Sequence, residues 1–452
     1  MGGLGMKTAI RLVVEYYNEK TGEVLSSEII REDTIKKPKS IKELGYLHEE
    51  QIALLQSIQD VKLRYETRLL NQEETCPKCS KKTKSNGMRK SKFHAVLTDH
   101  DVKIQRRHCQ CGWSSPDTIE QLYSSSSHPD LVEKQVIQGA ENSYRQASRQ
   151  LNAESKNIRS INNDDRIRRN VASVAKLIEV EKLKPYKSVV QKKAAKRLVV
   201  VIDGGHLKSN DNNSRSFEAM IATVYCSDNI RRIDKNHNEI TKKTSVASAL
   251  SDQQKTIKQL VLNACQKEGM NVGVTELTCL TDGASNCWSI THPLKSSCKE
   301  LINILDWFHI TKRFTLINNR IDNDFKEQIE KVKWFLWHGK SKEGLERLTQ
   351  LQFMIEDETL LSSLQDLYEY LTRNQKYLVN YQERQAARLP FTSTYAESSV
   401  NTVINARQKN NKKMQWSREG AHHILQIRTS HFSKTWQQDW EKAQLHIYKY
   451  AA

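Results

Sequence analysis

Short apolar runs that end on a carboxylate mark the second half of the chain. Leu198 to Ile202 are five aliphatic residues in a row, a run too short for a helix and too apolar for a half-exposed strand. We therefore expect a central strand that is buried on both faces and closed by Asp203. Gly204 and Gly205 follow, and a glycine pair allows either a turn or the close approach of a ligand. An Asp before Gly is also ordinary turn chemistry.

The same pattern recurs in the stretch from Glu276 to Ala284, where a short apolar run ends on Asp282 before a glycine. Two carboxylates at the ends of adjacent strands repel each other strongly unless a cation lies between them. A divalent cation held by few carboxylates plus water is the usual remedy. The recurrence therefore favours a metal site over two unrelated turns, and a third acid is expected to complete it.

The order of the predicted elements after residue 197 indicates the fold class. Three strands come first, with the third expected within residues 229–241, and a helix follows at about 252–267. The strand of Asp282, a polar helix near 286–299 and a strand at 301–305 complete the series. This is the order of the ribonuclease H (RNase H) fold, an α/β fold with a mixed sheet in which the first two strand-borne acids meet at one edge.

Residues 1–74 are expected to form a separate α+β region. Its first part alternates in the manner of strands, and residues 18–22 can turn a hairpin. A charged segment around residues 44–70 has the pattern of a helix. A structural cap, an assembly element and an accessory DNA contact are all compatible with this pattern.

Residues 75–115 contain two pairs of cysteines, Cys76 with Cys79 and Cys109 with Cys111. Four thiolates at two turns suit tetrahedral zinc, and the basic, strand-forming stretch between the pairs is typical of a zinc ribbon. With cysteine at all four positions, the ion would fold the module and perform no chemistry. A redox pair and unrelated thiols are alternatives. Three histidines are alternative ligands: His94, His100 and His108.

Residues 116–183 have the pattern of short helices and a longer third one. A capping box at Ser143 and Gln146 and a helix start at Asn163 support this interpretation. The segment predicts a helix-turn-helix module that reads a major groove, whereas a charged helical linker is the alternative. The arginines expected to contact DNA are Arg145, Arg149, Arg159, Arg166, Arg168 and Arg169.

The charge of the chain points to a polyanionic partner. Lys and Arg number 71 against 53 Asp and Glu, which gives a net charge of +18. Nucleic acid is the commonest such partner, although acidic membranes also attract basic chains. The sequence contains no apolar run long enough to predict a signal peptide or a membrane span. The nine cysteines do not form a disulfide framework, so a reduced cytoplasmic protein is expected.

Five stretches follow one another in the second half: VIDGGH, LTDGASNCW, ILDWFHITKR, WFLWHGK and TYAESSVNTVINARQKNNKKMQWSREGAHHILQIRT. Together they resemble the DDE transposases of bacterial insertion sequences, especially the ISKra-type group, over roughly residues 197–430. The resemblance implies that Asp203 and Asp282 are the first two catalytic acids. His309 would belong to a D-x2-H signature that follows the second acid. An all-helical insertion at about 311–390 is implied within a catalytic domain of residues 184–452.

The same resemblance selects Glu397 as the third acid. Residues 394–397 also satisfy a capping box, which would make Glu397 a helix cap. On the predicted helix, Glu397 shares an inward face with Val400, Asn401 and Ile404, where a solvated acid has little reason to lie. The residues that follow supply cations and an aromatic ring expected to line a DNA backbone. These residues are Arg407, Lys412, Lys413, Trp416 and Arg418.

The family resemblance implies a two-metal mechanism with Mg²⁺ or Mn²⁺ at the three acids and structural Zn²⁺ at the cysteines. One ion would activate water to cut the element end, and the freed 3′-hydroxyl would then attack target DNA. The implied partner is double-stranded DNA, both terminal inverted repeats and target, bound by a homo-oligomer in the bacterial nucleoid and not at a membrane. An RNase H-like nuclease without strand transfer is one alternative. A non-catalytic DNA-binding regulator derived from a transposase is the other.

Overall fold

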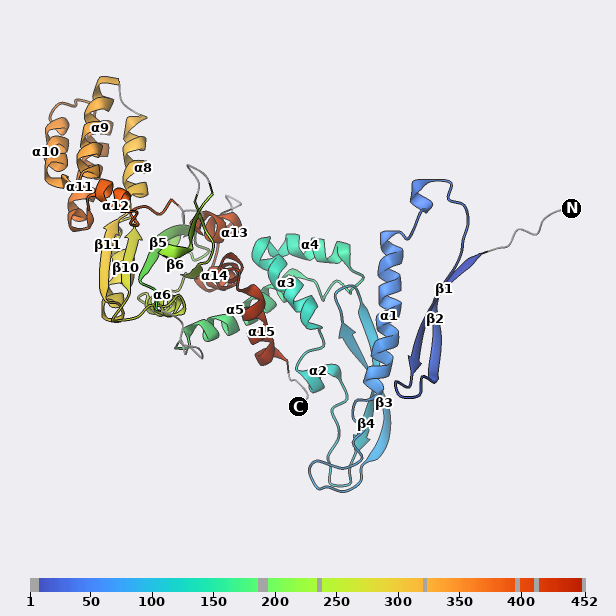
Figure 1. The fold of residues 1–452 in the computed structure, drawn as a ribbon. Coiled ribbons are helices and arrows are strands. Elements are labelled where there is room, and N and C mark those ends of the chain that lie inside the picture. Colours follow the sequence, from blue (N-terminus) through green and yellow to red (C-terminus); the bar gives the residue numbers. More distant parts are fainter. Residues whose placement is uncertain are drawn as a thin grey trace. The chain divides into compact units, whose positions relative to one another are not determined.

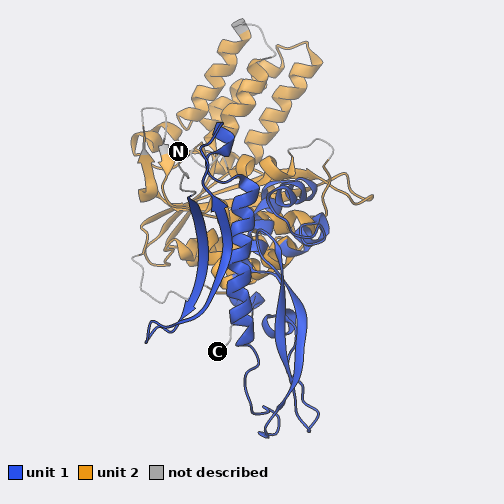
Figure 2. Cartoon of the chain, turned by 90° about the vertical axis from the view of Figure 1, so that its right-hand side faces the viewer, with its two compact units in different colours: residues 1–170, 443–452 blue, residues 171–442 orange. Residues whose placement is uncertain are grey.

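A computed structural model of the chain describes residues 8–185, 194–233, 238–319, 323–394, 399–409 and 414–448. The chain divides into two compact units (Figure 2). The amino-terminal unit comprises residues 1–170 and 443–452, and the sheet unit comprises residues 171–442. Within the described part of the chain, no helix is long and apolar enough to cross a membrane.

The amino-terminal unit begins with a two-stranded antiparallel ribbon of β1 (Ala9–Tyr17) and β2 (Val24–Thr34), followed by helix α1 (His48–Arg68). The predicted hairpin and helix are therefore confirmed. Tyr16 fastens the ribbon to α1, because its ring stacks on Tyr65 at 3.4 Å and its hydroxyl donates to a backbone carbonyl of the helix.

A second antiparallel pair, β3 (Lys84–His94) and β4 (Asp99–His108), packs against α1. The buried residues Val102 and Ile104 of β4 form the small core between these elements. Four helices follow: α2 (Ile119–Tyr123), α3 (Pro129–Glu141), α4 (Tyr144–Glu154) and α5 (Asp164–Leu183). The hydroxyl of Ser143 accepts the backbone N–H of Gln146 and caps α4 as the sequence predicts.

The sheet unit is built on a mixed sheet in which the described residues form five strands (Figure 1). These are β5 (Arg197–Lys208), β6 (Ser216–Cys226), β9 (Thr244–Ser248), β10 (Glu276–Thr281) and β11 (Glu300–Leu305). Their spatial order is β11-β10-β5-β6-β9. β10 is parallel to both β5 and β11, whereas β6 is antiparallel to both β5 and β9.

Two sequence predictions about this sheet are wrong. Asp203 does not end its strand, because β5 stays paired with β6 from Leu198 to Lys208. The stretch within 229–241 does not supply the third strand of the sheet either: β7 (Ile230–Arg232) and β8 (Asn238–Ile240) pair only with each other among the described residues. The third strand is β9, whose five residues are all buried although three of them are Ser or Thr. With so few apolar residues, β9 has no hydrophobic pattern from which a strand could be predicted.

Helices cover both faces of the sheet. Leu198, Val200 and Ile202 pack against α6 (Lys255–Lys267) and α7 (Ser285–Thr291). Val199 and Val201 face the helical insertion. The insertion contains α8 (Trp307–Asn318), α9 (Asn323–Trp337), α10 (Ser341–Gln352), α11 (Glu358–Arg373) and α12 (Tyr381–Ala386). The predictions of a doubly buried strand and of an α-helical insertion are thus confirmed.

After the insertion the chain continues with a π-helical turn, three α-helices and their connections. They are the turn Val400–Asn405, α13 (Ala406–Gln408), α14 (Arg418–Phe432) and α15 (Trp436–Ile447). Asn401 is exposed, which contradicts its predicted place on the inward face. The buried residues are Val403, Ile404, Arg407 and Gln408. A π-helix has a wider turn than the α-helix assumed from the sequence, so the inward face rotates along the chain.

Candidate functional site

The four predicted zinc ligands lie together at the base of the β3–β4 hairpin. The Sγ atoms of Cys76 and Cys111 are 3.6 Å apart, and those of Cys79 and Cys109 are 3.5 Å apart. All four sulfur atoms lie within 4.8 Å of one another. A tetrahedral site with metal–sulfur bonds of about 2.3 Å has sulfur–sulfur edges of about 3.8 Å. The four cysteines are therefore placed to bind a metal such as zinc.

The thiol of Cys79 is held in its neutral form by its surroundings. The backbone N–H of Lys81 lowers its pKa, but the thiols of Cys109 and Cys111, burial and the thiol of Cys76 together raise it to about 12. A metal ion would reverse that shift, since it favours thiolates. Two of the three alternative histidine ligands are engaged elsewhere: His94 Nδ1 lies 2.6 Å from Asp99, and His100 Nδ1 lies 2.5 Å from Asp60. The Nδ1 of His108 is buried without a hydrogen-bond partner among the described residues.

Asp203 and Asp282 meet at one edge of the central sheet. Ile202 pairs with Thr281 in the parallel register of β5 and β10, so the two acids that follow are adjacent. Burial raises the pKa of Asp203; His309 and the Gly204 N–H oppose the rise, and Asp282 adds to it. Burial therefore disfavours the charged form of Asp203 at this edge. Among the described residues, no three carboxylates of this edge have their oxygens within 4.8 Å of one another.

A third strand contributes Asp306 to the same edge. Thr281 pairs with Leu305, so Asp306 follows β11 as Asp282 follows β10. Asp306 is only 1% exposed. Its carboxylate accepts the N–H of Phe308 at 3.0 Å and the N–H of Ser393 at 2.9 Å, together with the Ser393 hydroxyl. Asp306 thus caps α8 and holds the segment that returns from the insertion.

His309, the predicted member of the D-x2-H signature, lies one turn into α8. Its Nε2 is 3.7 Å from a carboxylate oxygen of Asp306, and its side chain is 20% exposed. Burial raises the pKa of both Asp203 and Asp306, and His309 opposes the rise in each. His309 is therefore positioned to offset part of the negative charge at this edge.

Glu218 is a fourth acid that the sequence analysis missed. It lies on β6, its carboxylate crosses the face of Gly204, and Asn286 of α7 donates to it. A Cβ at Gly204 would collide with Glu218, so this glycine permits close approach and not a turn. Burial raises the pKa of Glu218, His206 opposes the rise, and Asp282 and Asp203 add to it. The available signal was a lone charge in the apolar run that forms β6.

The insertion contacts the Asp282 loop through Tyr370 of α11. The Tyr370 hydroxyl donates to the backbone carbonyl of Asp282 at 2.9 Å, and the Arg313 guanidinium lies 3.9 Å from the centre of its ring. An open cleft of ≈ 280 Å³ lies beside these residues and is also lined by Arg373 and Glu369. The insertion therefore brings both signs of charge next to Asp282.

Glu397, the predicted third acid, lies outside the described residues. The chain on both sides of residues 395–398 is attached near the acidic edge. Before them, Ser393 is bonded to Asp306. After them, Val400 and Ile404 pack over Gly205, with two Ile404 carbons 3.2 Å from the position of a Cβ there. Gly205, like Gly204, thus allows close approach.

The predicted DNA-contacting arginines of the amino-terminal unit fall into two groups. Arg145 and Arg149 are exposed on one face of α4, opposite the buried Ala147 and Leu151. Arg159, Arg168 and Arg169 are exposed as well, and Arg168 pairs with Asp165 at 3.0 Å. Arg166 differs, because it is half-buried and donates to the Ser127 hydroxyl at 2.9 Å. Its contact is structural, contrary to the prediction.

Two of the three predicted DNA-contacting residues that the structure describes near the carboxyl end are buried. Arg407 is 3% and Trp416 7% exposed. The two stack on each other at 4.9 Å, and the Trp416 indole donates to the Gln408 carbonyl. Their prediction as DNA contacts therefore conflicts with their burial. Arg418 is exposed and donates to the Ala249 carbonyl. Lys412 and Lys413 lie outside the described residues.

Comparison of the chain with models of known protein families and with curated proteins finds no match.

Proposed function

We propose that this protein is a DDE transposase, which cuts DNA strands at the ends of a mobile element and joins them to target DNA. One observation carries the proposal: Asp203, inside β5, lies beside Asp282, which follows the parallel strand β10, and burial raises the pKa of Asp203. Such a pair has little structural use without a cation, since each charge costs stability in the absence of a counter-charge.

The topology of the sheet supports an RNase H-like fold for the sheet unit. Three antiparallel strands, β5, β6 and β9, are followed by two strands parallel to the first, and β5 takes the centre of the sheet. The helical insertion follows β11, and the π-helical turn follows the insertion. This order agrees with the motif order on which the family resemblance rests.

Asp203, Asp282 and Glu397 are the proposed ligands of two Mg²⁺ ions. Mg²⁺ at such a site would lower the pKa of a bound water and stabilise the leaving 3′ oxygen. Carboxylate oxygens are the donors that this ion prefers, and a bound cation would offset the burial that raises the pKa of Asp203. His309 would help to hold Asp306, and with it the end of β11, in place. Glu218 of β6 adds a fourth carboxylate beside Gly204.

DNA binding is assigned to the amino-terminal unit. The exposed arginines of α4 lie on the second helix of a pair joined by only two residues, as in a helix-turn-helix. The net charge of +18 supports a nucleic-acid partner. Zinc at the four cysteines would hold the β3–β4 hairpin in place, which makes the metal structural.

A cleavage assay tests this function. With Mg²⁺ and a labelled duplex taken from DNA that flanks the reading frame, the wild-type protein should nick the element end and join it to a plasmid. Asp203→Asn and Asp282→Asn should each reduce both reactions at least about 10³-fold while leaving duplex binding intact. Glu300→Gln is the matched control, because Glu300 is exposed at the opposite end of the same sheet.

The same assay separates the two alternative functions. Nicking without joining would identify an RNase H-like nuclease. Duplex binding without Mg²⁺-dependent nicking by the wild-type protein would identify a DNA-binding regulator. Equal activity in Asp203→Asn, Asp282→Asn and Glu300→Gln would refute any catalytic role for this edge.

A further inference from the structure

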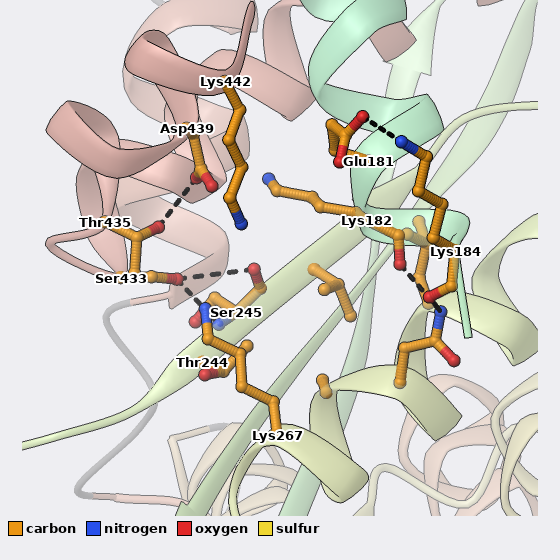
Figure 3. A pocket seen from close by; sticks show the side chains of 14 residues that line it. Glu181, Lys182, Lys184, Thr244, Ser245, Lys267, Ser433, Thr435, Asp439 and Lys442 are labelled. Atoms are coloured by element: carbon orange, nitrogen blue, oxygen red, sulfur yellow. Dashed lines mark hydrogen bonds and ion pairs between the residues drawn. The ribbon is translucent and has the colours of Figure 1, made fainter. Parts of the chain in front are cut away.

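A second polar cavity lies in the sheet unit away from the acidic edge. It has a volume of ≈ 140 Å³ and lies between the end of α5, strand β9 with helix α6, and helices α14 and α15 (Figure 3). Thr244, which lines it, pairs with Val224, and Val224 pairs with Val200. Val200 precedes Asp203 by three residues, so this cavity is separate from the proposed active site.

Lysines dominate the charged lining of the cavity. Four lysines face two carboxylates among the described residues that line it: Lys182, Lys184, Lys267 and Lys442, against Glu181 and Asp439. Both carboxylates already have partners, since Glu181 pairs with Lys184 and Asp439 accepts the Thr435 hydroxyl at 2.8 Å. The lining therefore has a surplus of two positive charges, which matches a dianion.

Lys182 extends across the cavity from α5, and Lys442 reaches toward it from α15 (Figure 3). The Lys182 ammonium donates to the Gln426 carbonyl at 3.2 Å and to the Thr429 hydroxyl at 3.1 Å. Neither acceptor carries a charge. Burial lowers the pKa of Lys182 to about 8; Asp439 and Glu179 oppose the shift, whereas Lys267 adds to it. The lysine thus has no charged hydrogen-bond acceptor among the described residues.

The backbone around the cavity also suits an anion. The Asn263 amide donates to the carbonyls of Lys182 and Lys184 at 2.7 and 3.0 Å, which covers the negative end of α5. Helix α15 begins directly after Thr435, so its positive end lies beside the cavity. Leu260 and Ala264 of α6 give an apolar floor, which lowers the local dielectric and strengthens charge pairing.

We propose that this cavity binds a phosphate group, with Lys182 and Lys442 as its charge partners. The group would come either from a small phosphorylated compound or from the backbone of bound DNA. The site is independent of the proposed catalytic function, because it shares no residue with the acidic edge.

Calorimetric titration of the full chain with inorganic phosphate and with pyrophosphate tests the site. Lys182→Met and Lys442→Met should each weaken binding at least about tenfold, because each removes one charge-assisted contact with the phosphate. Lys255→Met is the matched control, because Lys255 is exposed at the other end of α6. Thermal unfolding of each variant checks that it folds. No binding by the wild-type protein, or equal binding by all variants, would overturn the proposal.

Proton uptake gives a second readout that a merely structural lysine would not show. Phosphate near Lys182 would raise the pKa of its amine from about 8. Binding at pH 8 should therefore take up protons, which titrations in two buffers of different ionisation enthalpy detect. The uptake should disappear in Lys182→Met. Binding without proton uptake in the wild-type protein would contradict a direct contact with Lys182.

Competition distinguishes the two sources of the phosphate group. If DNA supplies it, Lys182→Met should weaken duplex binding and pyrophosphate should displace the duplex. If a small compound supplies it, duplex affinity should be the same in the wild-type protein and in Lys182→Met, while phosphate binding is lost.

Discussion

The cysteine module and the acidic edge are two candidate metal sites built in opposite ways. The cysteines come from two turns of one hairpin, and their four sulfur atoms already lie within 4.8 Å of one another. The acids come from strands far apart in the sequence and meet only through the register of the sheet. The cysteine module has all four ligands of a metal in place, whereas the acidic edge brings together carboxylates that need a cation as a counter-charge. A site that serves folding closes on its metal, and a site that serves chemistry keeps room for a substrate.

The largest expected effect is loss of the cysteine site. A Cys76→Ser, Cys79→Ser double variant removes two of four ligands, and structural zinc contributes about 10–16 kcal/mol to the folding of small modules. The wild-type protein should contain about one zinc per chain by metal analysis, and the variant none. Protease should then cut residues 75–115 of the variant first.

Cys226→Ser serves as the control for that variant, because Cys226 is a half-buried thiol of the sheet unit. It should retain the zinc and the protease resistance. A wild-type protein without zinc, or a double variant that keeps it, would show that the four cysteines do not form the metal site described here for the cysteine module.

The next effect concerns the acid that completes the open site. Glu397→Gln keeps the size of the side chain and can still cap a helix, at a stability cost of a few tenths to about 1 kcal/mol. It removes a charge that a divalent ion needs, so cleavage and strand transfer should fall at least about 10³-fold while duplex binding persists. Glu383→Gln and Glu419→Gln are controls on exposed acids and should stay active. Near-normal activity in Glu397→Gln, with loss in one control, would move the third acid to that position.

The smallest effect distinguishes two neighbouring acids by stability. Asp306→Asn loses part of a fully bonded carboxylate and should lower the free energy of unfolding by about 1–3 kcal/mol. Asp203→Asn should act in the opposite direction at pH 7 without metal. The pKa of Asp203 is raised in the folded protein, so its ionisation costs stability as the pH rises above the unfolded value of about 3.9. The amide removes that cost.

Thermal unfolding with a chelator present measures this contrast. Asp203→Asn should raise the midpoint at pH 7. The gain should vanish below about pH 4, where the wild-type carboxyl is protonated in both states. Equal destabilisation by both substitutions would show that Asp203 is a structural acid like Asp306.

The parts of the molecule that depend on local pattern could be predicted from the sequence. The doubly buried strand at Leu198 to Ile202 follows from five aliphatic residues in a row, and the cysteine cluster follows from two short spacings. Residues whose role depends on a distant partner could not be found. The Glu218 carboxylate comes to lie over Gly204 only when β6 pairs with β5. The hydroxyl and amide groups that satisfy Asp306 come from both ends of an insertion of more than eighty residues.

Close packing explains the remaining differences between the sequence predictions and the structure. Asp203 looked like a strand end because Gly204 and Gly205 suggest a turn, yet both glycines serve close approach within an extended strand. Arg407 was expected at a DNA backbone because it is a cation in a basic stretch. It is buried instead, and its guanidinium stacks on Trp416.

The packing of the insertion bears on how this chain can have evolved. The helices between Asp306 and Ser393 supply most of the buried residues in the core that contains Val199 and Val201, so the sheet and the insertion share one core. A shorter ancestor without these helices would have left that face open to water, and such apolar faces self-associate. Its sheet therefore needed another cover, either a different helix or a second subunit. Length variation among descendants should be confined to the ends of the helices that point away from the sheet.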